Sequence, residues 1–145
     1  MKNVGPRGNI LKVSEELKSN LENAGRHQHY PAAHVLFDED GECAGVCLVC
    51  KGKVRMSVRN LPDLDRDFAA GSLLGLPATF TGHPYSLTAV TLIESEVVHV
   101  PQNEFLALMR EQPELCKEAA EILGREVTFI QGALAERRRH LATAV

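Results

Sequence analysis

The sequence predicts a mainly β domain, a sandwich or barrel of short strands, with one helix before it and two helices after it. Short apolar runs recur between residues 35 and 100 and are separated by glycine, proline and acidic turns, which is typical of strands at close spacing rather than βαβ units. Helical periodicity then dominates the last third of the chain. With 145 residues and 44% hydrophobic content, the chain is expected to form one domain with a real core.

The N-terminal part predicts a loose tail over residues 1–9 and a helix over residues 10–23. Leu11, Leu17 and Leu21 recur at helical spacing, Ser14 is a candidate N-cap, and Gly25 is a helix stop. Residues 26–37 are expected to be extended, with a strand at 35–37.

Further strands are expected at 46–50, 54–58, 67–69, 87–93 and 97–100. The first two flank Gly52 with a short connection, which predicts a β-hairpin. The stretch from Gly71 to Thr91 holds more turn chemistry between apolar strands than any other segment. It can wrap backbone N–H groups around an anion, or it can be a plain corner of a barrel.

The last third predicts a short helix over residues 104–110, with Asn103 as its N-cap, and a long helix that begins at Pro113. A helix of about 28 residues spans about 40 Å, more than a barrel of this size covers. Apolar spacing of four and three over this helix favours a homodimeric coiled coil, although a stripe packed on the protomer's own barrel would look similar. The predicted dimer face contains Leu123, Val127, Ile130 and Leu134.

Charge and composition exclude several classes. The net charge of −3 provides no global attraction for nucleic acid, and the basic run at 137–139 is expected to complement the helix dipole, so no DNA contact is predicted from this chain. No apolar run has the length of a signal peptide or a membrane span, which predicts a soluble cytoplasmic protein. An enzyme is not expected, because the chain has no nucleophile elbow and no P-loop.

The spacing of cysteine and histidine residues matches the patterns of metal and redox sites only in part. Cys47 and Cys50 form a CxxC, with Cys43 four residues before it, but a zinc ribbon needs a second pair. Their odd separation places Cys47 and Cys50 on opposite faces of a strand, so buried strand cysteines are expected. His27 and His29 would share a strand face and are expected to be surface residues. No metal site is therefore predicted.

Short glycine-containing and apolar motifs accompany this order of elements: residues 36–42 (LFDEDGE), 45–54 (GVCLVCKGKV), 70–75 (AGSLLG), 96–100 (EVVHV) and Phe105. Together they resemble the cyclic-nucleotide-binding domain of the catabolite-activator and fumarate-nitrate-regulator (Crp/Fnr) superfamily. The resemblance covers roughly residues 10–142 and implies a double-stranded β-helix (jelly roll) over 10–112, followed by a dimerisation helix over 113–145.

The resemblance also implies that residues 71–91 occupy the position of the family's phosphate-binding cassette. There, a glutamate after the second glycine binds the ribose, and an arginine followed by a small hydroxyl residue binds the cyclic phosphate. Leu76 and Tyr85 replace the two charged residues, Ser86 keeps the hydroxyl, and Pro77 removes an N–H donor. Losing such an arginine typically costs ~2–5 kcal/mol, or about 30- to 4000-fold in affinity, so tight cyclic AMP binding is not expected.

The resemblance thus predicts a sensory, effector-binding domain of a transcription regulator whose effector is unknown. The predicted effector pocket contains Gly71, Gly75, Leu76, Pro77, Ala78, Tyr85 and Ser86. Alternatives on the same fold are a haem sensor, a metal sensor, a cysteine-based redox sensor and a ligand-free dimerisation or interaction module. The nominal haem ligands are His83, His99, Cys43 and Cys47. Family regulators continue into a helix-turn-helix domain beyond the long helix, whereas this sequence ends at Val145.

Overall fold

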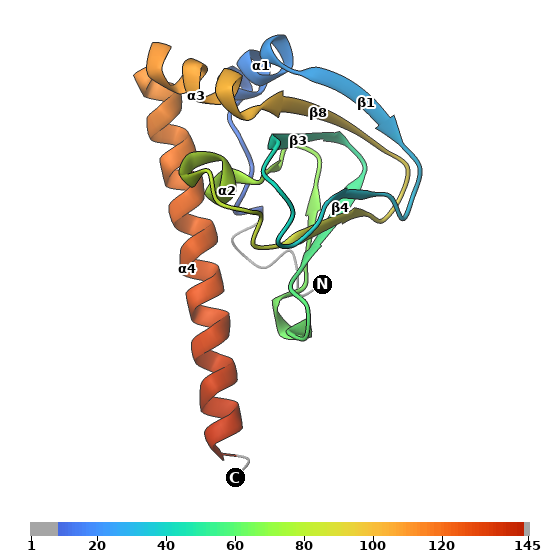
Figure 1. Cartoon of the computed structure of the whole chain (residues 1–145), viewed down its shortest axis with the longest axis vertical. Helices are drawn as coiled ribbons and strands as arrows, with labels where there is room; N and C mark the ends of the chain where they lie inside the picture. Colours follow the sequence, from blue (N-terminus) through green and yellow to red (C-terminus); the bar gives the residue numbers. More distant parts are fainter. Residues whose placement is uncertain (1–8, 144–145) are drawn as a thin grey trace.

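The computed structural model describes residues 9–143 and shows two antiparallel four-stranded sheets folded as a jelly roll, with a long helix along one side (Figure 1). The predicted fold class is confirmed; the predicted tail at 1–9 lies almost wholly outside the described residues. The first sheet contains, in spatial order, β1 (Arg26–Tyr30), β8 (Ser95–Pro101), β3 (Gly45–Lys51) and β6 (Leu73–Leu74). The second contains β2 (Val35–Phe37), β7 (Thr88–Thr91), β4 (Lys53–Ser57) and β5 (Arg66–Ala69).

The alternation of side chains explains how the sheets form the core. In β4, Val54 and Met56 are buried while Arg55 is exposed, which is the pattern of a strand with one face on the core. The central strand β3 is buried continuously from Gly45 to Val49, because it lies between β8 and β6 and is covered on both faces.

The predicted hairpin around Gly52 is wrong. β3 pairs with β8 and β6, whereas β4 pairs with β5 and β7, so the turn passes the chain from one sheet to the other. Gly52 has a φ of +101°, and a Cβ at this position would collide with Ser95 Oγ. A glycine turn between two apolar strands is therefore compatible with a crossover between sheets as well as with a hairpin.

Helix α1 (Glu15–Ala24) starts five residues later than the sequence predicts. Ser14 is the N-cap, and its Oγ accepts a hydrogen bond from the Leu17 N–H at 3.1 Å. The preceding residues are extended, and Lys12 forms a bridge with Ser72. Leu11 is nevertheless fully buried, so its apolar character reflects core packing of an extended segment rather than a helical face.

The C-terminal helices are α3 (Gln102–Glu111) and α4 (Pro113–Thr143). The start of α4 at Pro113 is as predicted, but the predicted N-cap at Asn103 is wrong. Pro101 occupies the cap position of α3, and Asn103 lies inside the first turn. Two short helices complete the chain, η1 (Pro62–Leu64) and α2 (Leu76–Thr81).

The long helix α4 packs on its own roll through one stripe and leaves another stripe uncovered. Leu115, Ala119, Ile122 and Glu126 are buried, at spacings of four, three and four, which is one helical face. Val127 and Leu141 remain 40% and 53% exposed. Figure 1 shows the C-terminal half of α4 running past α2 and beyond the body of the roll.

None of the helices within residues 9–143 combines the length and the apolar character needed to cross a lipid bilayer.

Candidate functional site

The cassette segment forms a compact corner around helix α2. Gly75 and Gly82 cap the helix at its two ends with φ of +90° and +78°, a region that other residues rarely adopt. A Cβ on Gly75 would lie 3.1 Å from the carbonyl oxygen of Gly45, so the glycine also permits close approach to β3. Leu76, at the family's glutamate position, is fully buried.

Tyr85, predicted to stand at the position of the family's arginine, is buried at this corner. Its ring is 5% exposed and stacks on Phe37 with a centroid distance of 4.1 Å. The hydroxyl donates to the Gly45 carbonyl at 2.7 Å and accepts from the N–H groups of Ala44 at 3.0 Å and Gly45 at 3.1 Å. Burial raises the pKa of this phenol to about 12, so it remains neutral. Tyr85 therefore closes the corner with neutral hydrogen bonds to the backbone.

Glu126 of α4 lies against the inner side of this corner. It borders a cavity of about 10 Å³ together with Phe37, Met56 and Tyr85. The residue is 3% exposed, and neither carboxylate oxygen has a hydrogen-bond partner among the described residues. Burial raises the pKa of Glu126 to about 7, because a charged carboxylate is unfavourable among apolar side chains.

Most of the predicted effector-pocket residues come together at this corner. Gly75, Pro77, Ala78, Tyr85 and Ser86 all border the small cavity. Gly71 lies apart from it, in the connection before β6, where its N–H donates to the Val49 carbonyl at 2.7 Å. The cavity holds at most about one water, so their role in binding an effector stays a prediction.

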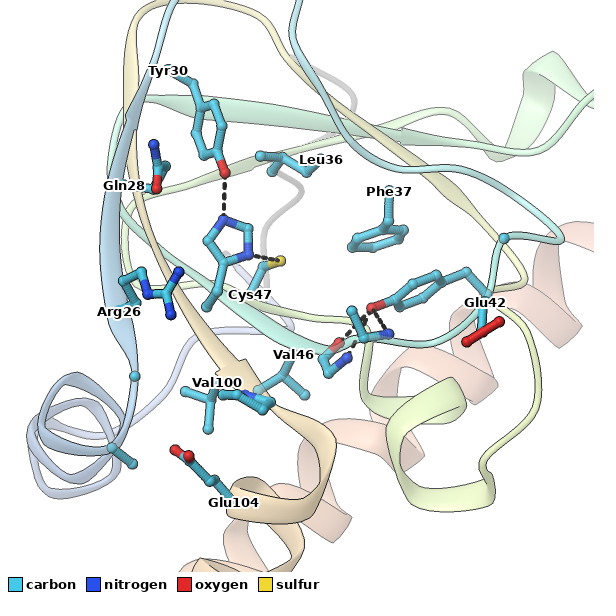
Figure 2. A pocket seen from close by; sticks show the side chains of 18 of the residues that line it. Arg26, Gln28, Tyr30, Leu36, Phe37, Glu42, Val46, Cys47, Val100 and Glu104 are labelled. Carbon is cyan, nitrogen blue, oxygen red and sulfur yellow. Dashed lines mark hydrogen bonds between the residues drawn. The ribbon is translucent and has the colours of Figure 1, made fainter.

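Tyr85 also borders a far larger cavity; Figure 2 shows side chains that line it. It has a volume of about 770 Å³ and lies between the first sheet and the loop after β2. That size is within the usual range for small-molecule sites. Tyr85 and Phe37 border both cavities, so the stacked pair forms the wall between them.

At one end of the large cavity, the polar side chains of Tyr30, His99 and Cys47 contact one another. The Tyr30 hydroxyl lies 2.7 Å from His99 Nε2, and His99 Nδ1 lies 3.4 Å from Cys47 Sγ. Burial, with the charge of Arg26 and then His34, lowers the pKa of His99. Burial raises the pKa of Cys47 to about 12, so its thiol is protonated. Arg26 forms no ion pair among the residues described, and it is exposed.

The rest of the lining combines an apolar wall with acidic side chains. Leu36, Phe37, Val46 and Val100 supply the apolar contacts. Asp38, Glu42 and Glu104 add three carboxylates against the single guanidinium of Arg26. The cavity therefore suits a ligand with an apolar body and little net negative charge.

Most of this lining was missed by the sequence-based prediction. Arg26, Gln28 and Tyr30 alternate along β1 and line the cavity, whereas His27 and His29 do not line it. The period of two over residues 26–30 was the available signal. The cavity itself depends on the closure of the roll, which no local pattern shows.

The nominal haem ligands do not fit a haem in this cavity. Both ring nitrogens of His99 are engaged, with Tyr30 and Cys47, and His83 is exposed outside the cavity lining. Cys43 lies 3.7 Å from the Thr79 hydroxyl and is also absent from the lining. Cys47 is 3% exposed, and its thiol lies 3.4 Å from His99 Nδ1.

The sequence profile of the cyclic nucleotide-binding domain matches residues 27–112, and the chain belongs to this family. The predicted resemblance is thereby confirmed. A comparison with curated protein sequences gives no significant match.

Solved structures share the fold at low sequence identity. The catabolite activator protein of Thermus thermophilus superposes with a TM-score of 0.73 at 22% identity, covering 87% of this chain and 61% of that protein. A protein from a cyclic-GMP-dependent pathway that regulates bacterial phytopathogenesis gives 0.70 at 18% identity, covering 83% and 96%. Oxidized CprK in complex with o-chlorophenolacetic acid gives 0.69 at 12% identity, covering 90% and 55%. The chain thus spans about three-fifths of the Thermus protein, and these likenesses establish the fold.

Proposed function

We propose that this chain is the sensory domain of a Crp/Fnr-type transcription regulator, and that its effector is a small molecule other than a cyclic nucleotide. The observation that carries the proposal is Tyr85, which replaces the phosphate-binding arginine and seals the cassette from within. With no cation at that position, the charge-assisted pair that holds a cyclic phosphate is lost. The large cavity beyond Tyr85 remains available.

The lining supports an effector with an apolar or aromatic body and one acidic group. Phe37, Val46 and Val100 would contact the body, and Arg26 would pair with the acid. The three carboxylates in the lining disfavour a ligand with more than one negative charge. A protein of the same fold, CprK, is described in complex with o-chlorophenolacetic acid, a molecule of this class.

The wall between the two cavities offers a route from effector to helix. A ligand that displaces Phe37 or Tyr85 in the large cavity moves side chains that also border Glu126 of α4. Coupling then requires the ligand to prefer one arrangement of α4 over another. The expected readout is the packing of Val127, Ile130 and Leu134.

The partly exposed apolar stripe of α4 favours dimerisation as a second role, with or without an effector. Val127 is 40% exposed, and Leu123, Ile130 and Leu134 are half-buried in the protomer. A second copy would cover them in a two-helix seam. Ile130→Glu is expected to give monomers by light scattering, whereas the matched surface change Gln131→Glu leaves the mass unchanged. A dimer that persists in Ile130→Glu would contradict the assigned face.

Calorimetric titration tests the effector class. Cyclic AMP and cyclic GMP are expected to give no micromolar binding, while o-chlorophenolacetic acid and related aromatic carboxylates bind and raise the melting temperature. Arg26→Gln should lower the affinity for the carboxylates by at least about tenfold. Arg55→Gln is the control, because Arg55 is an exposed arginine outside the cavity. Micromolar cyclic AMP binding, or binding of aromatic amines in place of acids, would overturn the proposal.

A further inference from the structure

The outer face of the first sheet gathers a second cluster of side chains, away from the effector cavity. His27 of β1, Glu96 of β8 and Cys50 of β3 each offer one donor atom, and these atoms lie within 4.8 Å of one another. His27 Nδ1 and Glu96 Oε2 are 3.1 Å apart. None of the three residues lines the large cavity, whereas Arg26, Gln28 and Cys47 do.

The strand register explains why distant residues meet here. The order β1-β8-β3 makes the three strands neighbours, with Glu96 on the middle strand. In the strand register, Glu96 lies opposite His29 of β1 and opposite Lys51 of β3. His27 is two residues from His29 and therefore lies on the same face of β1. The β3–β8 register is irregular between Val49 and Lys51, which is where Cys50 lies. A bulge of this kind re-aims a side chain.

The donor set is that of a zinc-type site. Imidazole nitrogen, thiolate sulfur and carboxylate oxygen are the ligands that Zn²⁺ takes in proteins, at about 2.0–2.3 Å. In a tetrahedron with such bonds, the ligand atoms are about 3.3–3.8 Å apart. The His27–Glu96 separation of 3.1 Å is therefore close to what a bound cation requires. A carboxylate oxygen of Glu22, on α1, lies 3.8 Å from Cys50 Sγ and adds negative charge beside the site.

We propose that His27, Cys50 and Glu96 bind one divalent cation of the zinc class, with water at the fourth position. The side chains of His27 and Glu96 are 49% and 31% exposed, which leaves an entry path from solvent. The cation would join three neighbouring strands beside α1, on the sheet face opposite the effector cavity. The sequence placed His27 and Cys50 in separate spacing patterns, an HxH and a CxxC, and neither pattern supplies this ligand set.

Cobalt substitution tests the site directly. Metal-free protein, kept reduced with a non-thiol reductant, is titrated with Co²⁺ and then with Zn²⁺. We expect a near-ultraviolet sulfur-to-cobalt charge-transfer band that saturates at one equivalent and is abolished by one equivalent of zinc. Absence of the band, or a band that zinc does not displace, would overturn the proposal and leave His27–Glu96 as a surface ion pair.

Variants identify the ligands. Cys50→Ser should abolish the charge-transfer band, and His27→Gln should weaken cobalt binding at least about 100-fold, since even outer partners of a metal site contribute 10- to 100-fold. His29→Gln is the matched control. His29 lies on the same strand face as His27, but its side chain forms an ion pair with Glu94. Cys116→Ser, on α4, is the thiol control. Circular dichroism verifies the fold of each variant. A band that survives in Cys50→Ser, or one that disappears in Cys116→Ser, would contradict the assignment.

Discussion

The two sides of the Tyr85 ring differ in almost every physical respect. On the α2 side, the cassette corner is nearly filled, and it is bordered by Glu126, whose carboxylate has no hydrogen-bond partner among residues 9–143. On the β1 side, a cavity of about 770 Å³ is lined by a connected polar group around His99. Tyr85 thus borders two cavities of very different volume, one beside α2 and one beside the first sheet.

The difference follows from what each side can do with a charge. A desolvated cassette needs a cation to bind a phosphate. Here the neutral phenol of Tyr85 fills the corner instead, and its hydroxyl is hydrogen-bonded to the backbone. The cavity side keeps Arg26 exposed to solvent, where a charge is tolerated. Four predictions test how far the two sides act independently.

Replacing Tyr85, which stands between the two cavities, should have the largest effect on stability. Tyr85→Ala deletes a buried ring and its three hydrogen bonds, so we expect the free energy of unfolding to fall by about 3–5 kcal/mol. Tyr85→Phe keeps the ring but leaves the polar groups of Ala44 and Gly45 without their partner, and should lose about 1–3 kcal/mol. Urea denaturation measures both. Equal losses in the two variants would mean that the hydroxyl, and not the ring, supports the wall.

Glu126 should make the cassette side sensitive to pH. Its pKa is raised from 4.5 to about 7 in the folded state, so the folded protein binds more protons than the unfolded chain between these values. Stability from this group is therefore present below pH 4.5 and is lost as pH rises to 7, by about 3 kcal/mol in total. Glu126→Gln should remove this loss and be more stable than the wild type at pH 8. A pH profile that is identical in the two proteins would contradict the buried, unpartnered carboxylate.

His99 should give the cavity side the opposite dependence. Its folded-state pKa lies below its ordinary value of 6.5, so the unfolded chain binds more protons near that pH. The stability it contributes is present above pH 6.5 and is lost as pH falls below it. His99→Gln should therefore flatten the acid side of the stability curve while leaving the Glu126 step in place. Thermal melts between pH 5 and pH 8 compare the two variants, and a merged response would mean that the two sides are coupled.

Ser86→Ala should have the smallest effect. Ser86 is predicted to supply the hydroxyl of the family's cassette. It is exposed, and of the two cavities it borders the small one and not the large one. We expect a change in unfolding free energy within about 0.5 kcal/mol and unchanged binding of aromatic carboxylates. Loss of carboxylate binding in this variant would place the effector in the cassette after all.

Much of the fold could be predicted because the signals are local. The strands at 35–37, 54–57 and 67–69 and the start of α4 at Pro113 follow from turn residues and apolar runs that act within a few residues. The start of α1 was misplaced because Leu11 is apolar for tertiary reasons, as a buried residue of an extended segment. The hairpin at Gly52 failed for a related reason, since a turn does not record which strands pair across the roll.

The sequence by itself determined the family, because the family's motifs follow one another in a linear pattern. It also predicts a cassette without charged residues, at Leu76, Pro77 and Tyr85. Only the tertiary structure decided what those changes mean. The Tyr85 hydroxyl reaches the backbone 40 residues away, and Glu126 enters the same corner from α4. Likewise, His27, Cys50 and Glu96 meet because three strands far apart in the chain become neighbours in one sheet. Cavities and ligand sets of this kind are products of strand pairing and roll closure, which join residues that no local spacing connects.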